Sequence, residues 1–404
     1  MINSRMHWLP TLETLTTHRA VWRMFVATAL ILSSVSIALA GPREQAQRIH
    51  DRLAGVPPEA SVLINMEALI QADPINGPID AAMIAMDNPN FYAVTLKNLA
   101  APWTNRDQSV FVPLNDYILT VIGLVKDDEP FDQILWDDVL YVGNGISPAP
   151  SASSNAHYEA LEARMQAPDF DPDEIVRTTQ SSVYPLPPAA TAGVMTSRAA
   201  AEAFFIAGTN RAMFRFTLMN HMCMDLEQVH DTSIVPDRIR QDVSRSPGGD
   251  SRVFLNNCIG CHAGMDPMAQ AFAYYNYDDV SGSIEYTAGN VQPKYFNNEE
   301  TFPDGFVTPD DAWANYWREG QNAHIGWSSS LTGSGNGAKS LGQELAGTQA
   351  FAQCQVQKVF KAVCLRDPVD AGDRGQVATM AGAFGSTFDL RQVFAQSAKY
   401  CMGN

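Results

Sequence analysis

The feature that most constrains this chain is the pentapeptide Cys258-Ile259-Gly260-Cys261-His262. Two cysteines with a two-residue gap, followed directly by a histidine, have the spacing that covalent attachment of a c-type haem requires. The two thiols would reach the two vinyl groups of one porphyrin, and the imidazole would reach the iron from the same side. We therefore expect Cys258 and Cys261 to carry one haem c and His262 to be its proximal iron ligand.

Two other kinds of site use a Cys-x-x-Cys pair. A thioredoxin-like redox pair is expected next to a strand–helix–strand pattern, and no such pattern surrounds this segment. A zinc site needs a second pair of ligands at short spacing, which the sequence does not offer. Both alternatives are weaker than haem attachment.

The first forty residues resemble an export signal. Met24 to Ala40 is an apolar run that follows Arg19 and Arg23 and ends in Ala-Leu-Ala before Gly41. It is shorter than the roughly 20 apolar residues of a membrane span, although an uncleaved anchor is the alternative. We expect a periplasmic or secreted protein, in a compartment where disulfides persist.

Four cysteines remain outside the pentapeptide. Cys354 and Cys364 are expected on one helix, ten residues and therefore about 15 Å apart, which is too far for a disulfide. The preferred pairs are consequently Cys364–Cys401 and Cys223–Cys354. The alternative is that all four are ordinary buried thiols.

The chain is acidic, with 27 Lys and Arg against 44 Asp and Glu and a net charge of −17. Nucleic acids and anionic lipid surfaces are therefore unfavourable partners, and membrane contact is expected only through the signal or an uncleaved anchor. A redox partner protein with a basic patch is favoured. The alternative is that the charge serves solubility alone.

The fold class that the apolar spacing predicts is mainly α, with several helical modules, a c-type haem site and a loop-rich insertion that contains a small hairpin. About 364 residues after the signal are too many for one small cytochrome. The expected divisions are a signal at 1–40, an N-terminal helical domain at 41–142, a linker region with a short helix at 143–192, a haem c module at 193–280, a loop-rich insertion at 281–340 and a C-terminal helical module at 341–404.

Individual helices are expected at 43–53, 61–69, 91–99, 111–125, 130–140, 171–178, 197–223, 235–243, 349–364, 375–384 and 388–399. The expected hairpin would join 283–287 to 291–295. After the haem motif we expect a short turn and a new helix, with Asp266 as its N-cap and Pro267 as its first residue. Met265 then lies directly behind the haem and is expected to contribute to its binding.

The aromatic residues that follow the motif are expected near the haem as apolar cover, with a radical relay as the less favoured alternative. They are Phe272, Tyr274, Tyr275 and Tyr277. Such cover matters because burial helps to set the reduction potential of the iron.

The distal iron ligand is not determined by the sequence. No methionine occurs between Met268 and Met380, and Met265 and Met268 are too close to His262 to reach the opposite face of the haem. The candidates are Met195, His324, and Met222 or another residue of the His221/Met222 segment. A vacant distal position is a further alternative.

A resemblance to a family supports this interpretation. The segment Cys258 to Asp278 (CIGCHAGMDPMAQAFAYYNYD) resembles the haem-bearing module of the planctomycete-type secreted cytochrome c proteins, where the haem motif precedes Met-Asp-Pro and an aromatic ending. Residues 193–196 and 208–211 look like the earlier part of that module, and 351–366 is similar to its C-terminal companion. Residues 53–58 and 130–135 are only faintly similar to N-terminal modules of such proteins.

The resemblance implies a secreted, helix-rich haem protein and supports Cys258, Cys261 and His262 as haem residues, but it supplies no substrate. The function expected is that of a single-haem c-type cytochrome that exchanges electrons with a protein partner, rather than a catalyst. The alternatives are a haem enzyme with an open distal site, acting on peroxide or a small organic substrate, and a structural component of a surface complex.

Overall fold

The chain is mainly helical, as its apolar spacing predicts. The computed structural model describes residues 40–206 and 208–403. The predicted export signal therefore lies outside the described residues, apart from its last position. Residues Pro42–Met402 form one compact unit, and the following description concerns that unit.

Short π-helices interrupt the α-helical segments at Phe91–Leu96, Leu218–Met222 and Phe254–Cys258, and the last of these leads directly into the site described below. The bounds of the α-helices are α2 Pro42–Ala54, α3 Ala60–Ala72, α4 Gly77–Met86, α5 Lys97–Ala100, α6 Asp116–Lys126, α7 Ala156–Met165, α8 Gln180–Val183, α9 Arg198–Phe204, α10 Arg211–Thr217, α11 Ser251–Val253, α12 Ile259–Ala269, α13 Gly337–Ala346, α14 Gln349–Cys364, α15 Ala371–Thr387 and α16 Leu390–Cys401.

The strands of the described residues form three separate antiparallel pairs. Strand β1 (Leu140–Gly143) pairs with β2 (Ile175–Thr178), β3 (Tyr275–Asp278) with β4 (Ser283–Tyr286), and β5 (Ala312–Ala314) with β6 (Ser334–Asn336). Each strand is only three or four residues long, so the pairs are too small to form a layer of the fold and only join neighbouring segments.

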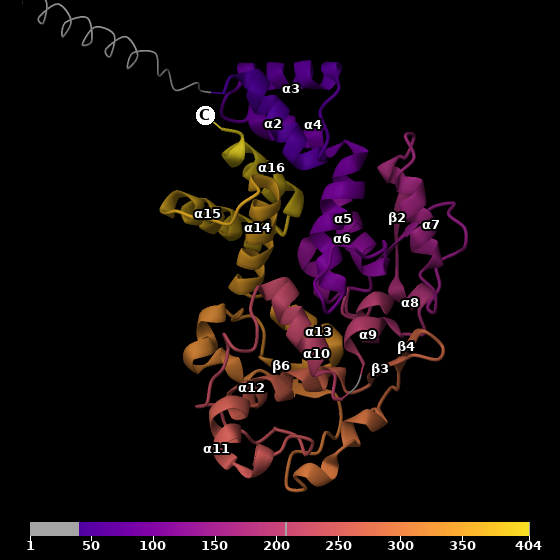
Figure 1. Ribbon diagram of the computed structural model, residues 1–404, viewed down its shortest axis with the longest axis vertical. Coiled ribbons are helices and arrows are strands. Elements are labelled where there is room, and N and C mark those ends of the chain that lie inside the picture. Colours follow the sequence, from indigo (N-terminus) through magenta and orange to yellow (C-terminus); the bar gives the residue numbers. More distant parts are fainter. Residues whose placement is uncertain (1–39, 207, 404) are drawn as a thin grey trace, which may run out of the picture. The chain divides into compact units, whose positions relative to one another are not determined.

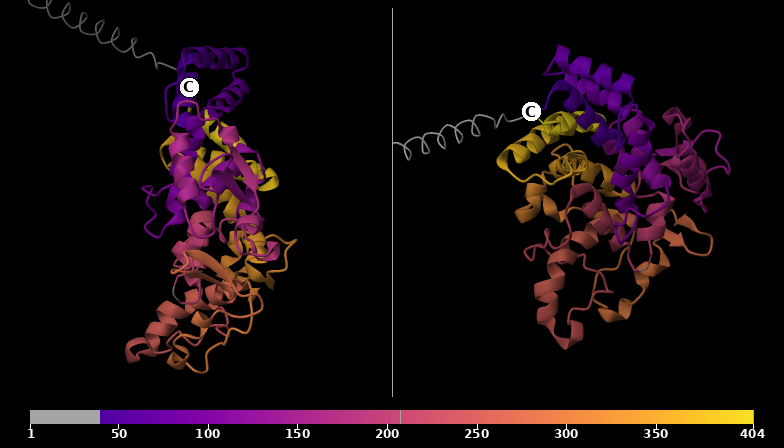
Figure 2. Two further views of the ribbon diagram at one scale, coloured as in Figure 1. Left: turned by 90° about the vertical axis from the view of Figure 1, so that its right-hand side faces the viewer. Right: turned by 45° about the horizontal axis from the view of Figure 1, so that its top comes forward.

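The two ends of the unit meet. Helices α2, α3 and α4 pack on one another, and α16 packs against α4 and α2 (Figure 1). Both further views again show the indigo N-terminal helices beside the yellow C-terminal ones, with the salmon-coloured α11–α12 region far from them (Figure 2). The haem motif therefore lies at the opposite end of the unit from the junction of its two ends.

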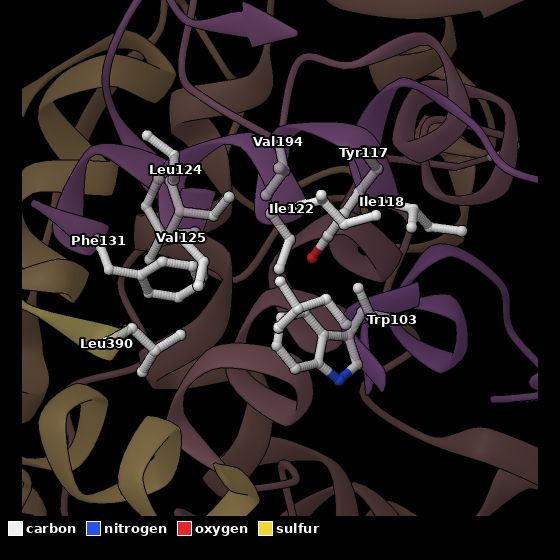
Figure 3. Packing of buried hydrophobic residues seen from close by; sticks show 14 of the residues in the cluster. Trp103, Tyr117, Ile118, Ile122, Leu124, Val125, Phe131, Val194 and Leu390 are labelled. Carbon is white, nitrogen blue, oxygen red and sulfur yellow. The ribbon is translucent and has the colours of Figure 1, made fainter. Parts of the chain in front are cut away.

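Helix α6 runs through the main hydrophobic core. Its side chains are buried on nearly every face, and the Asn115 side chain accepts a hydrogen bond from the Ile118 amide to cap its start. In Figure 3, Val125 lies beside Phe131 and Leu390 at one end of this cluster, and Tyr117 lies near Trp103 at the other. The core thus joins segments that are almost 300 residues apart in sequence.

A buried carboxylate connects this core to the helices that precede the haem motif. Asp116 accepts hydrogen bonds from the backbone amides of Arg198 and Ala199 at the start of α9, at 2.5 and 3.1 Å, and from the Tyr184 hydroxyl at 2.6 Å. Amides at a helix start have no partner within the helix, so a carboxylate there stabilises it. Helix α9 is consequently held to α6, and α10 follows it.

Five of the expected helices were predicted correctly. Those expected at 43–53, 61–69, 349–364, 375–384 and 388–399 are α2, α3, α14, α15 and α16. The expected helix at 111–125 begins later, at Asp116, because Asn115 caps it. The helix expected at 91–99 is a π-turn that continues into α5, and the one at 197–223 is split into α9, α10 and a final π-turn.

Four shorter elements were predicted wrongly. Residues 130–140 form a 3₁₀ turn and the start of β1, and 171–178 form a capped 3₁₀ turn followed by β2, because these two segments pair with each other. Residues 235–243 contain turns but no helix. In the expected hairpin, 283–286 pairs with β3 instead, and 293–296 is a 3₁₀ turn.

Both preferred disulfides are present. Cys223 is bonded to Cys354 and Cys364 to Cys401, so both bonds fasten α14, one near its middle and one at its end. Helix α14 is thereby covalently linked to the segment after α10 and to α16.

Within the described ranges, no helix is both long enough and apolar enough to cross a membrane.

Candidate haem-attachment site

The haem motif is helical from its first residue. Cys258 ends a π-turn and the remaining four residues form the first turn of α12. Because successive residues of an α-helix advance by about 100°, Cys258, Cys261 and His262 fall within an arc of about 100° on one face. The two thiols and the imidazole are therefore presented on the same side of one rigid helix.

The two thiols are free. Cys258 and Cys261 are half-buried and do not form a disulfide with each other, and the Cys261 thiol lies 3.5 Å from the Leu226 carbonyl oxygen. Burial, and next the neighbouring Cys258, raise the pKa of Cys261. Reactive thiols of redox pairs have a lowered pKa, and the raised pKa of Cys261 differs from that pattern.

A buried carboxylate orients His262. The Nδ1 atom of His262 lies 3.1 Å from Oδ1 of Asp266, one helical turn further along α12. The Asp266 side chain has no exposed surface, whereas that of His262 is 22% exposed. With Nδ1 occupied on the protein side, Nε2 is the ring nitrogen left for a ligand, which is the arrangement typical of metal-binding histidines.

Arg211 balances the charge of Asp266. Its guanidinium donates two hydrogen bonds to Asp266, at 2.7 and 2.9 Å, and two to Asp242, at 2.6 and 2.9 Å. Burial alone would raise the pKa of Asp266, but Arg211 and His262 lower it well below its usual range. Asp266 is consequently a carboxylate that accepts hydrogen bonds from both sides.

The opposite face of α12 is anchored by close packing. A Cβ atom added to Gly264 would lie 1.8 Å from Nε1 of Trp317, and one added to Gly260 would lie 2.5 Å from Nε2 of His230. Only glycine at these two positions lets the indole and the imidazole lie directly on the helix. Gly260, the glycine inside the motif, therefore allows His230 to pack on one face of the helix, opposite the face that carries the cysteines.

Asp266 is not the N-cap that the sequence predicts. Helix α12 starts at Ile259 and continues through Pro267 to Ala269, so no turn separates the haem motif from the following residues. A proline inside a helix removes one backbone hydrogen bond. Here it lies in the last turn, and the helical position of Asp266 lets it reach both His262 and Arg211, which offsets that loss.

The predicted ligand candidates lie in different surroundings. Met195 is buried and lines a small cavity with Tyr117, and Met222 is also buried in the main core. His324 is exposed, and its Nδ1 lies 2.6 Å from the Gln321 carbonyl oxygen. Met265 is 3% exposed and packs into the main core from α12. The choice of distal ligand stays a prediction.

The aromatic residues after the motif form part of the core. Phe272 and Tyr275 are fully buried and both pack on Phe205, and the Tyr275 hydroxyl donates to the Ala190 carbonyl at 2.6 Å. Tyr274 and Tyr277 are 8% exposed. These contacts hold the end of α12 and β3 against α9 and its preceding loop.

A cleft of about 630 Å³ borders the motif segment. The amide of Asp231, one of its lining residues, donates to the Gly260 carbonyl at 3.0 Å. Its charged and aromatic lining also includes Asp237, Tyr316 and Glu319. The cleft thus lies near the motif, and the charged residues of its lining are mainly acidic.

Asp266 and Arg211 are the site residues whose roles the sequence did not reveal. The separation of four residues between His262 and Asp266 is the signal that places them on one helical face. It was hidden by Pro267, which is typical of a helix start. Arg211 lies 55 residues away from Asp266, and only the fold brings them together.

The arrangement fits a covalently attached haem. Two free thiols and an imidazole share one face of a helix, and Nδ1 of the imidazole is held while Nε2 is not. Among the residues that the structure describes, no three His, Cys, Asp or Glu side chains are grouped to hold a bare metal ion. Comparison with known proteins gives no further identification: no family model, no curated protein and no solved structure matches the chain.

Proposed function

We propose that this protein is a single-haem c-type cytochrome that exchanges electrons with a protein partner in the periplasm or outside the cell. The observation that carries the proposal is the shared helical face of Cys258, Cys261 and His262, with Nδ1 of His262 held by the buried Asp266. The resemblance of residues 258–278 to the haem module of planctomycete-type secreted cytochromes supports the same conclusion.

When bound, the haem supplies a one-electron Fe(III)/Fe(II) couple. The residues of the chain provide its attachment and its surroundings. Cys258 and Cys261 would attach the porphyrin to α12, and His262, whose Nδ1 is held by Asp266, would offer Nε2 to the iron. The cysteine face of the helix is only half-buried, so a partner would have access to a haem held there.

The charge of the site indicates the kind of partner. Glu227 and Asp225 lie close enough to Cys261 to influence its pKa, and the whole chain carries a net charge of −17. An acidic surface near the porphyrin edge attracts a partner with a basic patch and increases the rate of encounter.

The test is covalent haem attachment in an export-competent host with a cytochrome c maturation system. The wild-type protein is expected to give the alkaline pyridine spectrum of a c-type haem, with one haem per chain. A double variant Cys258→Ala/Cys261→Ala is expected to contain none. The matched control Cys364→Ala/Cys401→Ala also removes two cysteines but leaves the motif, and should keep the haem. A wild-type protein without covalent haem would refute the proposal.

The second candidate function is a haem enzyme, which needs an open iron position and room for a substrate. The cleft of about 630 Å³ does not favour it, because the cleft borders the side of α12 on which His230 and Trp317 pack, opposite the cysteine face. The optical spectrum separates the two functions. A six-coordinate, low-spin haem that does not bind CO supports electron transfer, whereas a high-spin haem that binds CO at once supports the enzyme.

A further inference from the structure

The hydrogen bond between His262 and Asp266 has a consequence for the reduction potential. We infer that Asp266 is a positioning residue that strengthens His262 as an electron donor to the iron and so lowers the reduction potential, and that Arg211 limits this effect. The inference rests on the proposed haem attachment, but it concerns residues outside the haem motif. Asp266 and Arg211 are the pair that adjusts the reduction potential.

The first step of the argument is the nature of the acceptor. A carboxylate that accepts a hydrogen bond from Nδ1 increases the basicity of the ring more than a neutral acceptor does. The Asp266 side chain is fully buried, so its interaction with the imidazole is not weakened by water. A more basic imidazole stabilises Fe(III) relative to Fe(II).

The second step is the competition for the same carboxylate. Arg211 donates to both oxygens of Asp266, and its Nε shares Oδ1 with His262. The Arg240 amide lies 3.4 Å from Oδ2, as a weaker third donor. The Nε atom of Arg211 withdraws charge directly from Oδ1, the oxygen that faces His262, and the donors to Oδ2 withdraw charge from the same delocalised carboxylate, so Arg211 reduces the donation that Asp266 alone would cause.

The electron balance is simple. One electron, supplied by a reducing protein partner, converts Fe(III) to Fe(II). No bond to the protein breaks, and the proton of His262 stays on Nδ1 in both oxidation states, hydrogen-bonded to Asp266. The pair therefore changes the equilibrium constant of the electron transfer without taking part in a proton transfer.

The main experiment compares reduction potentials of holo-proteins by spectroelectrochemistry. Asp266→Asn is expected to raise the potential by roughly the 59 mV that corresponds to a tenfold change in the one-electron equilibrium constant. Arg211→Gln is expected to lower it. Asp266→Glu, which keeps a carboxylate, should restore a value near that of the wild type. EPR g values of the oxidised proteins should shift in opposite directions in the Asn and Gln variants.

The matched control is Asp242→Asn. Asp242 is the other partner of Arg211 and does not contact His262, so this variant breaks the same ion-pair network without removing the acceptor of Nδ1. Its potential should change much less than that of Asp266→Asn. Equal shifts of the reduction potential in these two variants would mean that any nearby negative charge has the same effect, and this would overturn the inference.

A second measurement is independent of the haem. In the haem-free Cys258→Ala/Cys261→Ala protein at alkaline pH, long-range ¹H–¹⁵N NMR is expected to show the His262 proton on Nδ1. A proton on Nε2 there would contradict the inference. A wild-type protein that never acquires haem would instead refute the proposed function, and the tautomer would still test the Asp266 contact.

Discussion

Two glycines show how single residues define the haem motif. Gly260 and Gly264 lie one turn apart on α12, and His230 and Trp317 occupy the space that their side chains would need. The cysteines face away from these contacts because they lie elsewhere on the helix. The glycines are thus required for packing on one face of the helix, while the cysteines and His262 lie on the opposite face.

Replacing Gly264 by alanine tests this packing. The new methyl group would overlap the Trp317 indole, and overpacking of this kind costs about 1–3 kcal/mol. We expect Gly264→Ala to lower the free energy of unfolding in urea by at least this amount.

The matched control is Gly375→Ala in α15. Gly375 is exposed and has no heavy atom near the position of the added Cβ, so the better helix propensity of alanine should stabilise the protein by about 0.5–1 kcal/mol. If both variants had the same effect, the contact of Trp317 with α12 would not matter for stability.

Element by element, the sequence predicted what local periodicity determines. Helices α2, α14 and α16 have amphipathic patterns, and each was found, as were α3 and α15. Residues 171–178 were expected to be helical because Asp171 has the features of a helix cap, and it does cap one turn. The strand that follows depends on pairing with β1, about 35 residues earlier, which no local pattern can reveal.

The same distinction holds for the site. Cys258, Cys261 and His262 were predicted as haem residues because five consecutive residues carry the signal, and this stays a prediction. The role of Asp266 was missed because the sequence favoured a helix start at Pro267, and the role of Arg211 depends on a contact across 55 residues. A local motif can therefore suggest the proposed attachment chemistry, but only the fold shows that Asp266 and Arg211 lie next to it.

Helix α14 carries a largely buried lysine, Lys358, whose charged form is disfavoured by burial. The Nζ atom of Lys358 lies 4.3 Å from the centre of the Trp103 ring, and burial lowers the pKa of Lys358 from 10.5 to about 7. His221, which packs on Trp103, is fully buried, and its pKa is lowered first by burial and then by Lys358. The folded state therefore favours the neutral forms of both groups.

The pKa of Lys358 predicts a pH dependence of stability. Between pH 7 and about 10.5 the unfolded chain holds a proton that the folded chain has lost, so the free energy of unfolding rises with pH in this window. Lys358→Met should remove this rise and, at pH 7 and below, stabilise the protein by about 1 kcal/mol, a value reduced because part of the side chain is exposed.

Lys361→Met is the control for this prediction, because Lys361 is exposed on the same helix and pairs only with the exposed Asp367. Urea unfolding of both variants from pH 6 to pH 10.5 gives the measurement. Identical pH profiles for the two variants would show that Lys358 is not destabilised by its surroundings.

On the scale of the whole molecule, the haem motif and the junction of the chain ends lie at opposite ends of the unit (Figure 1). The main core draws residues from α2 and α16 and reaches α12 through Met265 and Met268, whereas Cys258 and Ile259 pack in a separate small cluster. Two disulfides link α14 to the segment after α10 and to α16. The motif thus belongs to a disulfide-linked unit, which suits the proposed exchange of electrons without a large rearrangement.

The net charge of −17 gives a prediction about the partner. Oppositely charged proteins meet faster at low ionic strength, and salt screens this attraction within a Debye length of about 10 Å at 0.1 M. With a small basic cytochrome as the redox probe, we expect the second-order rate constant of electron transfer to fall at least several-fold between about 10 mM and 500 mM salt. A small acidic electron carrier should show the opposite trend, because salt relieves repulsion. The rate constants are measured by stopped-flow spectroscopy of the haem bands. Salt-independent rates with both probes would mean that the acidic surface does not guide the partner and serves solubility instead.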